Sequence, residues 1–157
     1  MELVYVGSAG DQGGTLRSRL SDHLNRKGWQ TSFRRKVLSH VLGISERPRL
    51  DQTYKSQLKQ STPQITQEIV HSFAFKCIMT QDYHDFEIWL IHKYQAQLWN
   101  TQKYQRKVIN NDFSKLEESL LATKIIPFSH FEQTAAMIPD FVGVYIIFQM
   151  RFIDAIK

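Results

Sequence analysis

Cysteine is nearly absent from this chain, since Cys77 is the single one among 157 residues. One cysteine can form neither an internal disulfide nor a cysteine zinc cluster, which excludes a disulfide-stapled secreted scaffold and a structural zinc domain. Seven glycines and four prolines exclude collagen-like and low-complexity chains. The longest apolar runs, such as residues 144–148, are too short to span a membrane, and residues 1–5 do not resemble a signal peptide. We therefore expect a soluble, cytoplasmic protein without membrane contact, folded as one domain over residues 1–157.

Positive charge is concentrated in one part of the sequence. The net charge is +5, but residues 17–59 hold eleven Lys and Arg against three acids, which leaves the remainder slightly acidic. A one-sided basic region is typical of a surface that binds a polyanion such as nucleic acid, although a solvated face without a partner has the same composition. Five of its cations are candidate nucleic-acid contacts: Arg17, Arg26, Arg34, Arg35 and Lys36.

Hydrophobic patterning predicts a small α/β (α+β) protein. Segments rich in β-branched and aromatic residues predict three strands, at residues 2–7, 73–79 and 141–148. Apolar residues spaced three and four apart predict helices at 15–27, 32–43, 65–71, 85–99 and 113–123. Residues 44–64 are polar and are interpreted as an insertion with loop or weakly helical structure, and residues 101–140 as an acidic helical segment. The expected fold is a three-stranded, mainly antiparallel sheet flanked by helices.

Side chains suited to phosphodiester chemistry stand near the ends of these elements. Alternate residues of a strand share a face, so Tyr5 is expected to point the same way as Leu3 and Gly7. On the first helix, Arg19 and His23 are four residues apart and are expected to lie on one polar stripe. A carboxylate that holds Mg²⁺ and a guanidinium that stabilises charge on phosphate oxygens are what metal-assisted phosphodiester hydrolysis requires.

Three separate segments together resemble the GIY-YIG nuclease family. Residues 3–9 (LVYVGSA), followed by residues 16–20 (LRSRL) and His23, resemble the second half of the family motif. Residues 86–91 (FEIWLI), continuing to Asn100, are similar to its metal-binding helix and downstream asparagine. Gly143-Val144-Tyr145 is similar to the GIY element itself, and the resemblance covers residues 2–43, 73–100 and 141–149.

The order of these segments departs from the family pattern. In the family the GIY strand comes first and leads by a hairpin into the YIG strand, whereas here the YIG-like strand opens the sequence and the GIY-like strand nearly closes it. A circular permutation, with both termini in the hairpin between two adjacent strands, accounts for this order. The alternatives are a chance Gly-aliphatic-Tyr triplet and a homodimer in which the last strand is domain-swapped into a neighbouring molecule.

The resemblance implies a role for each matching residue. Glu87 would be the sole protein ligand of a divalent cation, Mg²⁺ or Mn²⁺, and Arg19 would hold the scissile phosphate. Tyr5 and Tyr145 would flank the attacking water, one of them as general base, and His23 would assist that proton transfer.

Asn100 would fix this site from outside. The implied function is that of an endonuclease hydrolysing DNA phosphodiester bonds. One alternative is a catalytically inactive nucleic-acid-binding module that retains the fold. Another is a protein-interaction subunit that uses the acidic helix expected at residues 113–123.

Overall fold

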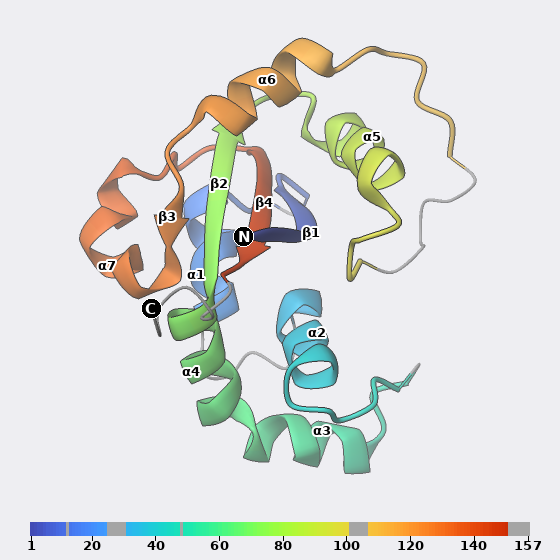
Figure 1. Cartoon of the computed structure of the whole chain (residues 1–157), viewed down its shortest axis with the longest axis vertical. Coiled ribbons are helices and arrows are strands. Elements are labelled where there is room, and N and C mark those ends of the chain that lie inside the picture. Colours follow the sequence, from blue (N-terminus) through green and yellow to red (C-terminus); the bar gives the residue numbers. More distant parts are fainter. Residues whose placement is uncertain (12, 25–30, 48, 101–106, 151–157) are drawn as a thin grey trace.

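The computed structural model describes residues 1–11, 13–24, 31–47, 49–100 and 107–150 (Figure 1). Its strands are β1 (Glu2–Ala9), β2 (Phe73–Met79), β3 (Ile126–Pro127) and β4 (Gly143–Gln149). Its helices are α1 (Leu16–Leu24), α2 (Ser32–His40), α3 (Gln52–Gln60), α4 (Thr62–Ser72), α5 (Tyr83–Tyr94), α6 (Ser114–Ala122) and α7 (Phe131–Thr134), with 3₁₀ turns η1 (Phe128–His130) and η2 (Ala135–Met137). The expected mixture of helices and strands is confirmed.

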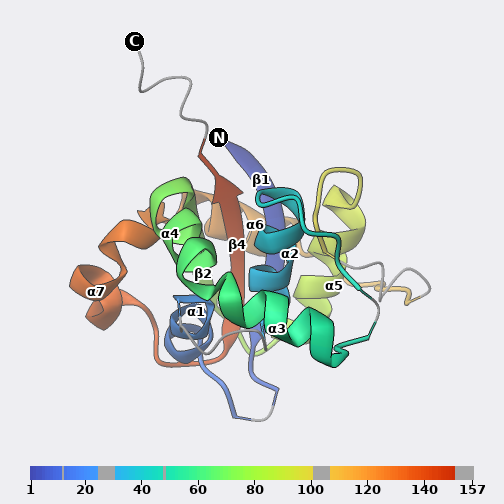
Figure 2. The ribbon, with the colours of Figure 1, turned by 90° about the horizontal axis from the view of Figure 1, so that it is seen from below.

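The sheet has four strands within the described residues, not three, in the order β1-β4-β2-β3. All three pairings are antiparallel, as expected. The additional strand, β3, has only two residues, which is too short to produce a sequence pattern. The first and last long strands are neighbours, with Glu2 opposite Gln149, so the start of β1 lies beside the end of β4 (Figure 2).

Helices cover both faces of this sheet. One apolar core contains Phe33, Phe73 and Phe75 and is enclosed by α1 to α4 with η1 and α7. The second core contains Phe86 and Leu90 of α5 and lies on the opposite face, where α6 completes it. Figure 2 shows α1 to α4 in front of the sheet and α6 behind it. In the described part of the chain, no helix combines the length and the apolar character needed to cross a membrane.

A β-bulge in β1 changes which residues share a face. The pairing with β4 shifts register between Leu3 and Tyr5. Val4 and Tyr5 consequently both pack into the first core, while Leu3 and Val6 pack into the second. The expectation that Tyr5 points the same way as Leu3 is therefore wrong, because a bulge inserts one residue that strict alternation does not count.

The polar segment 44–64 is more ordered than expected. Asp51 caps α3, its carboxylate accepting a hydrogen bond of 2.8 Å from the backbone N–H of Tyr54. Tyr54 and Leu58, one turn apart, are buried and anchor the helix on the first core. Pro63 then occupies the first turn of α4, where its missing N–H costs nothing. Two buried side chains are enough to fix a helix whose other residues are polar.

The segment 101–140 is helical only in part. It contains α6, η1, α7 and η2, but also β3, which pairs with β2 and extends the sheet. Residues 101–106 lie outside the described part of the chain.

Candidate active site

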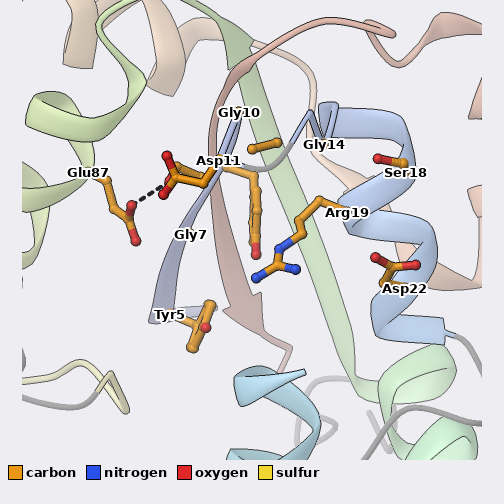
Figure 3. A pocket seen from close by; sticks show the side chains of 12 residues that line it. Tyr5, Gly7, Gly10, Asp11, Gly14, Ser18, Arg19, Asp22 and Glu87 are labelled. Carbon is orange, nitrogen blue, oxygen red and sulfur yellow. Dashed lines mark hydrogen bonds between the residues drawn. The ribbon is translucent and has the colours of Figure 1, made fainter. Parts of the chain in front are cut away.

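A cavity of about 420 Å³ opens beside β1 and is lined by β1, the loop that follows it, α1, α5 and β4. Four residues selected from the sequence line it: Tyr5, Arg19, Glu87 and Tyr145. These residues come from four different elements, and the fold brings them together (Figure 3). His23 and Asn100 do not line the cavity. They form hydrogen bonds with Tyr145 and Val6, respectively.

Gly7 brings the two tyrosines close to each other. Gly7 lies opposite Tyr145 in the β1–β4 ladder. A Cβ atom at this position would lie 2.2 Å from Cζ of Tyr145, so only glycine leaves room for the ring. The ring of Tyr145 consequently stacks near that of Tyr5, with centroids 6.5 Å apart and planes 21° apart. Two phenol groups thus share one wall of the cavity.

His23 lies behind Tyr145 and is not part of a solvated stripe with Arg19. Its Nε2 lies 2.7 Å from the hydroxyl oxygen of Tyr145, and both side chains are almost completely buried. Burial, helped by the charges of Arg19 and Arg34, lowers the pKa of His23 to about 3. The imidazole is therefore neutral at neutral pH. The expected polar stripe shared with Arg19 is not formed, because α1 turns His23 toward the sheet while Arg19 stays exposed.

Burial also disfavours the ionised form of both tyrosines. It raises the pKa of Tyr145 well above its ordinary value, and the nearby Tyr5 adds to that rise. Burial likewise raises the pKa of Tyr5, but Ser32, Arg19 and Arg35 act in the opposite direction. Both phenols are therefore protonated at neutral pH, and Tyr5 is surrounded by more groups that favour its ionisation.

Arg19 is the exposed cation of the cavity. It extends from α1 into the cavity, from the side opposite Glu87 (Figure 3). The first backbone N–H groups of α1 are already bonded, since Leu16 donates to the carbonyl of Phe141 at 2.9 Å and Arg17 to that of Pro139 at 3.2 Å. Because these donors are occupied, an anion in the cavity depends on the guanidinium of Arg19 rather than on the helix end.

Glu87 enters the cavity from α5, on the side opposite α1 (Figure 3). Its carboxylate accepts a hydrogen bond from the hydroxyl of Ser8, the residue that follows Gly7 in β1. A carboxylate facing a polar space of this volume fits Mg²⁺, which binds few protein ligands and keeps several waters. Among the described residues, no group of three or more His, Cys, Asp or Glu is placed to hold a metal ion. Three carboxylates line the cavity, those of Asp11, Asp22 and Glu87, and Glu87 is the one that the sequence resemblance selects as a metal ligand.

Asn100 supports β1 from its outer edge. Its side-chain oxygen accepts from the N–H of Val6 at 2.9 Å, and its amide group donates to the Val6 carbonyl at 2.8 Å. The neighbouring N–H of Trp99 donates to the carbonyl of Val4 at 2.7 Å. The segment after α5 therefore pairs with the open edge of the strand that carries Tyr5 and Gly7.

Two of the expected nucleic-acid contacts are structural. Arg34 is completely buried and donates to the carbonyl of His23 at 2.8 Å and to the hydroxyl of Thr66 at 2.9 Å. Lys36 is buried and forms an ion pair of 2.5 Å with Glu46. These predictions are wrong, because neither cation is exposed to a phosphate backbone.

The other three expected contacts differ among themselves. Arg17 donates to the carbonyl of Ile138 at 3.2 and 2.9 Å and so holds the loop before β4 against α1. Arg35 is half-buried, and its Nε has no hydrogen-bond partner among the described residues. Arg26 lies outside the described residues. Arg35 as a phosphate contact therefore stays a prediction.

Sequence reasoning missed several polar residues of the cavity. Four further side chains contribute to its lining: Ser8, Asp11, Ser18 and Asp22. Ser8 is adjacent to Gly7 in the YVGS motif, which was a signal for its position. Asp11 lies in a glycine-rich loop, whose path a sequence pattern does not define, and Ser18 and Asp22 lie on α1 within one turn of Arg19.

Comparisons of this chain with protein-family models, curated proteins and solved structures find no match. The chemistry of the site is therefore argued from the residues of the cavity and the contacts between them.

Proposed function

We propose that this protein is a divalent-metal-dependent endonuclease of the GIY-YIG type that hydrolyses DNA phosphodiester bonds. The observation that carries the proposal is the convergence of Tyr5, Arg19, Glu87 and Tyr145 on one cavity. The sequence resemblance selected these residues from three segments that lie far apart in the chain. The carboxylate and the guanidinium enter the cavity from opposite sides (Figure 3), so a phosphate bound by Arg19 would face a divalent cation held by Glu87.

Each of the cavity residues has a separate role in the proposed hydrolysis. Arg19 binds the phosphate and stabilises charge on its oxygens. Glu87 would hold the divalent cation, which when bound supplies Lewis-acid stabilisation of the same charge. One of the two phenols first releases its proton to solvent. The phenolate then takes a proton from the attacking water as the water oxygen bonds to phosphorus, while the bond to the sugar oxygen breaks and that oxygen takes a proton from solvent.

Tyr5 is the better candidate for the general base. Burial and the charge of Glu87 raise the pKa of both tyrosines. Ser32, Arg19 and Arg35 act against this rise at Tyr5, whereas at Tyr145 Arg19 alone does so and Tyr5 adds to the rise. Tyr145 is instead fixed by its 2.7 Å hydrogen bond to neutral His23 and by a hydrogen bond with Arg19. We therefore assign Tyr145 the task of orienting the water and the phosphate.

The strand arrangement supports the permutation as the origin of the unusual motif order. β4, with the GIY-like residues, pairs directly with β1, which carries the YIG-like residues. A hairpin joining the end of β4 to the start of β1 would give the family order. The same pairing weakens the domain-swap alternative, because β4 already completes the cavity within one chain.

The inactive binding module is the less favoured function. That alternative depends on a broad basic surface, and the burial of Arg34 and Lys36 removes two of its cations. The cavity keeps all four of the residues that the chemistry needs. The burial of these two cations, together with the four residues that line the cavity, favours a catalytic centre over a surface that only binds phosphate.

The test is cleavage of plasmid, branched and single-stranded DNA with Mg²⁺ or Mn²⁺ by the wild type and Glu87→Gln. The control is Glu118→Gln, at an exposed position of α6 outside the cavity. We expect metal-dependent cutting that Glu87→Gln abolishes and Glu118→Gln retains. If no protein cuts while all bind DNA equally in EDTA, the binding module replaces the nuclease.

A further inference from the structure

Ser8 is the residue that connects the tyrosine strand to Glu87. After the bulge, Gly7 lies on the Tyr145 side of β1, and Val6 packs toward α5. Ser8 therefore falls on the α5 side by alternation, and its hydroxyl donates to Oε2 of Glu87. This hydrogen bond ties the carboxylate to the backbone that carries Tyr5 and Gly7.

A second contact fixes the position of α5 relative to the residues that follow Ser8. Tyr83 precedes Glu87 by four residues, so the two side chains lie on one face of α5. The ring of Tyr83 covers Gly10, where a Cβ atom would lie 2.3 Å from its Cζ, and its hydroxyl donates to Asp11 at 3.4 Å. α5 thus contacts the β1 region at two points, Ser8 and Gly10. Because two contacts fix the helix, packing defines the distance between Ser8 and Glu87, and this distance does not depend on one flexible side chain.

We propose that Ser8 is a positioning residue that holds the Glu87 carboxylate in the orientation in which it binds the divalent cation. This inference rests on the proposed function, since it takes Glu87 as the metal ligand. Hydrogen-bond donors to a ligating carboxylate fix its rotation, and their removal typically weakens metal binding about 10–100-fold. Ser8 is on a strand and its partner is on a helix, so each rotamer is restrained by a rigid element.

A purely structural role, in which the bond only attaches α5 to β1, predicts something different. It would lower the stability of the Ser8→Ala variant without changing the metal affinity of the folded protein. Metal binding measured on folded protein therefore separates the two roles. Ser8→Thr restores the hydroxyl in a residue that suits a strand and provides the conservative rescue.

The experiment titrates Mn²⁺ into the full chain without DNA and follows free Mn²⁺ by electron paramagnetic resonance. The proteins are wild type, Ser8→Ala, Ser8→Thr, Glu87→Gln and the control Ser21→Ala, at an exposed position of α1 outside the cavity. We expect Ser8→Ala to weaken Mn²⁺ binding about tenfold, and Ser8→Thr and Ser21→Ala to remain within about twofold of wild type. Thermal unfolding of each variant confirms that the folded protein is being titrated.

The outcomes separate this inference from the proposed function. Wild-type affinity in Ser8→Ala, together with loss of binding in Glu87→Gln, overturns the role of Ser8 alone. Wild-type affinity in Glu87→Gln overturns Glu87 as the ligand and with it the metal site of the proposed function. If Ser8→Ala does not fold, failure of Ser8→Thr to bind Mn²⁺ overturns the inference, because that variant retains the donor.

Discussion

The hydroxyl of Tyr145 and Nε2 of His23 lie 2.7 Å apart, and both side chains are almost completely buried. Nδ1 of the same imidazole is buried and has no hydrogen-bond partner among the described residues. A ring in this environment is strongly disfavoured as a cation, and burial is the main reason that its pKa falls to about 3. The pair therefore couples the stability of the fold to pH at the wall of the cavity.

We predict that His23 makes the protein less stable as the pH falls. The pKa of His23 is 6.5 as a model value and about 3 when folded, so the unfolded chain binds the proton first. Its contribution is fully present above pH 6.5 and is lost as the pH falls toward 3. Between pH 7 and 4.5 this loss amounts to about 2–3 kcal/mol of unfolding free energy.

Urea unfolding at these two pH values measures the effect. His23→Gln should be less stable at pH 7 and lose less stability on acidification than wild type. The control is His71→Gln, at an exposed position of α4, which should follow the wild-type pH dependence. An equal acid-induced loss in wild type and His23→Gln would show that other groups cause it.

We predict that Gly7→Ala is destabilising out of proportion to its size. The added Cβ would overlap the ring of Tyr145 at 2.2 Å, and moving this buried ring would break its hydrogen bond with His23. Forcing a methyl group into such a site typically costs about 1–3 kcal/mol. Gly14→Ala is the matched control, because the nearest atom to its added Cβ is 3.8 Å away. Equal urea midpoints for both variants would contradict the close approach.

The three long strands and four of the cavity residues could be predicted from the sequence, whereas the burial of individual cations could not. The strand at residues 73–79 was predicted with the bounds that the structure has. Its aromatic and apolar residues favour a strand through local preference alone. Tyr5, Arg19, Glu87 and Tyr145 were found through the resemblance of their segments to the GIY-YIG motifs. The burial of Arg34 depends on Thr66, thirty-two residues further along the chain, so its place in an Arg-Arg-Lys run gave no sign of it.

The β-bulge and the polar helix α3 were missed for related reasons. The bulge between Leu3 and Tyr5 breaks the alternation on which strand faces are assigned, and no glycine or proline marks it. In α3, only Tyr54 and Leu58 are buried, so the apolar stripe is too narrow for a periodicity test. In both cases tertiary packing, not local preference, decides the structure.

We predict opposite consequences for two adjacent arginines of α2. Arg34→Ala leaves the buried carbonyl of His23 without its donor and opens a cavity, which should cost about 2–4 kcal/mol of unfolding free energy. Arg35→Ala removes a half-buried guanidinium whose Nε has no described partner, so its effect on stability should be small.

Arg35→Ala should instead weaken DNA binding. The loss of one phosphate contact lowers the slope of log affinity against log salt by about 0.9. Filter binding in EDTA at several salt concentrations, alongside urea unfolding, measures both properties. Unchanged DNA affinity in Arg35→Ala would remove this residue from the binding surface.

We predict that Asn100→Ala destabilises the edge of β1, although Asn100 does not line the cavity. The substitution removes both hydrogen bonds to the backbone of Val6, on an otherwise open strand edge. We expect a loss of about 1–2 kcal/mol and faster hydrogen exchange of the Val6 N–H. Asn110→Ala, at an exposed position, is the control. Unchanged exchange at Val6 would show that the segment after α5 does not hold this edge.

The two tyrosines should respond differently to removal of their hydroxyl groups. Tyr5→Phe deletes the proposed base, so the rate of DNA cleavage at saturating Mg²⁺ should fall about 10²–10⁴-fold, with DNA binding preserved. Tyr145→Phe also deletes the hydrogen bond to His23, which leaves a buried imidazole nitrogen unpaired. It should therefore lower both the cleavage rate and the unfolding free energy, the latter by about 1–3 kcal/mol. Single-turnover cleavage and urea unfolding of both variants separate these roles, and a larger rate loss in Tyr145→Phe would transfer the assignment of the base to Tyr145.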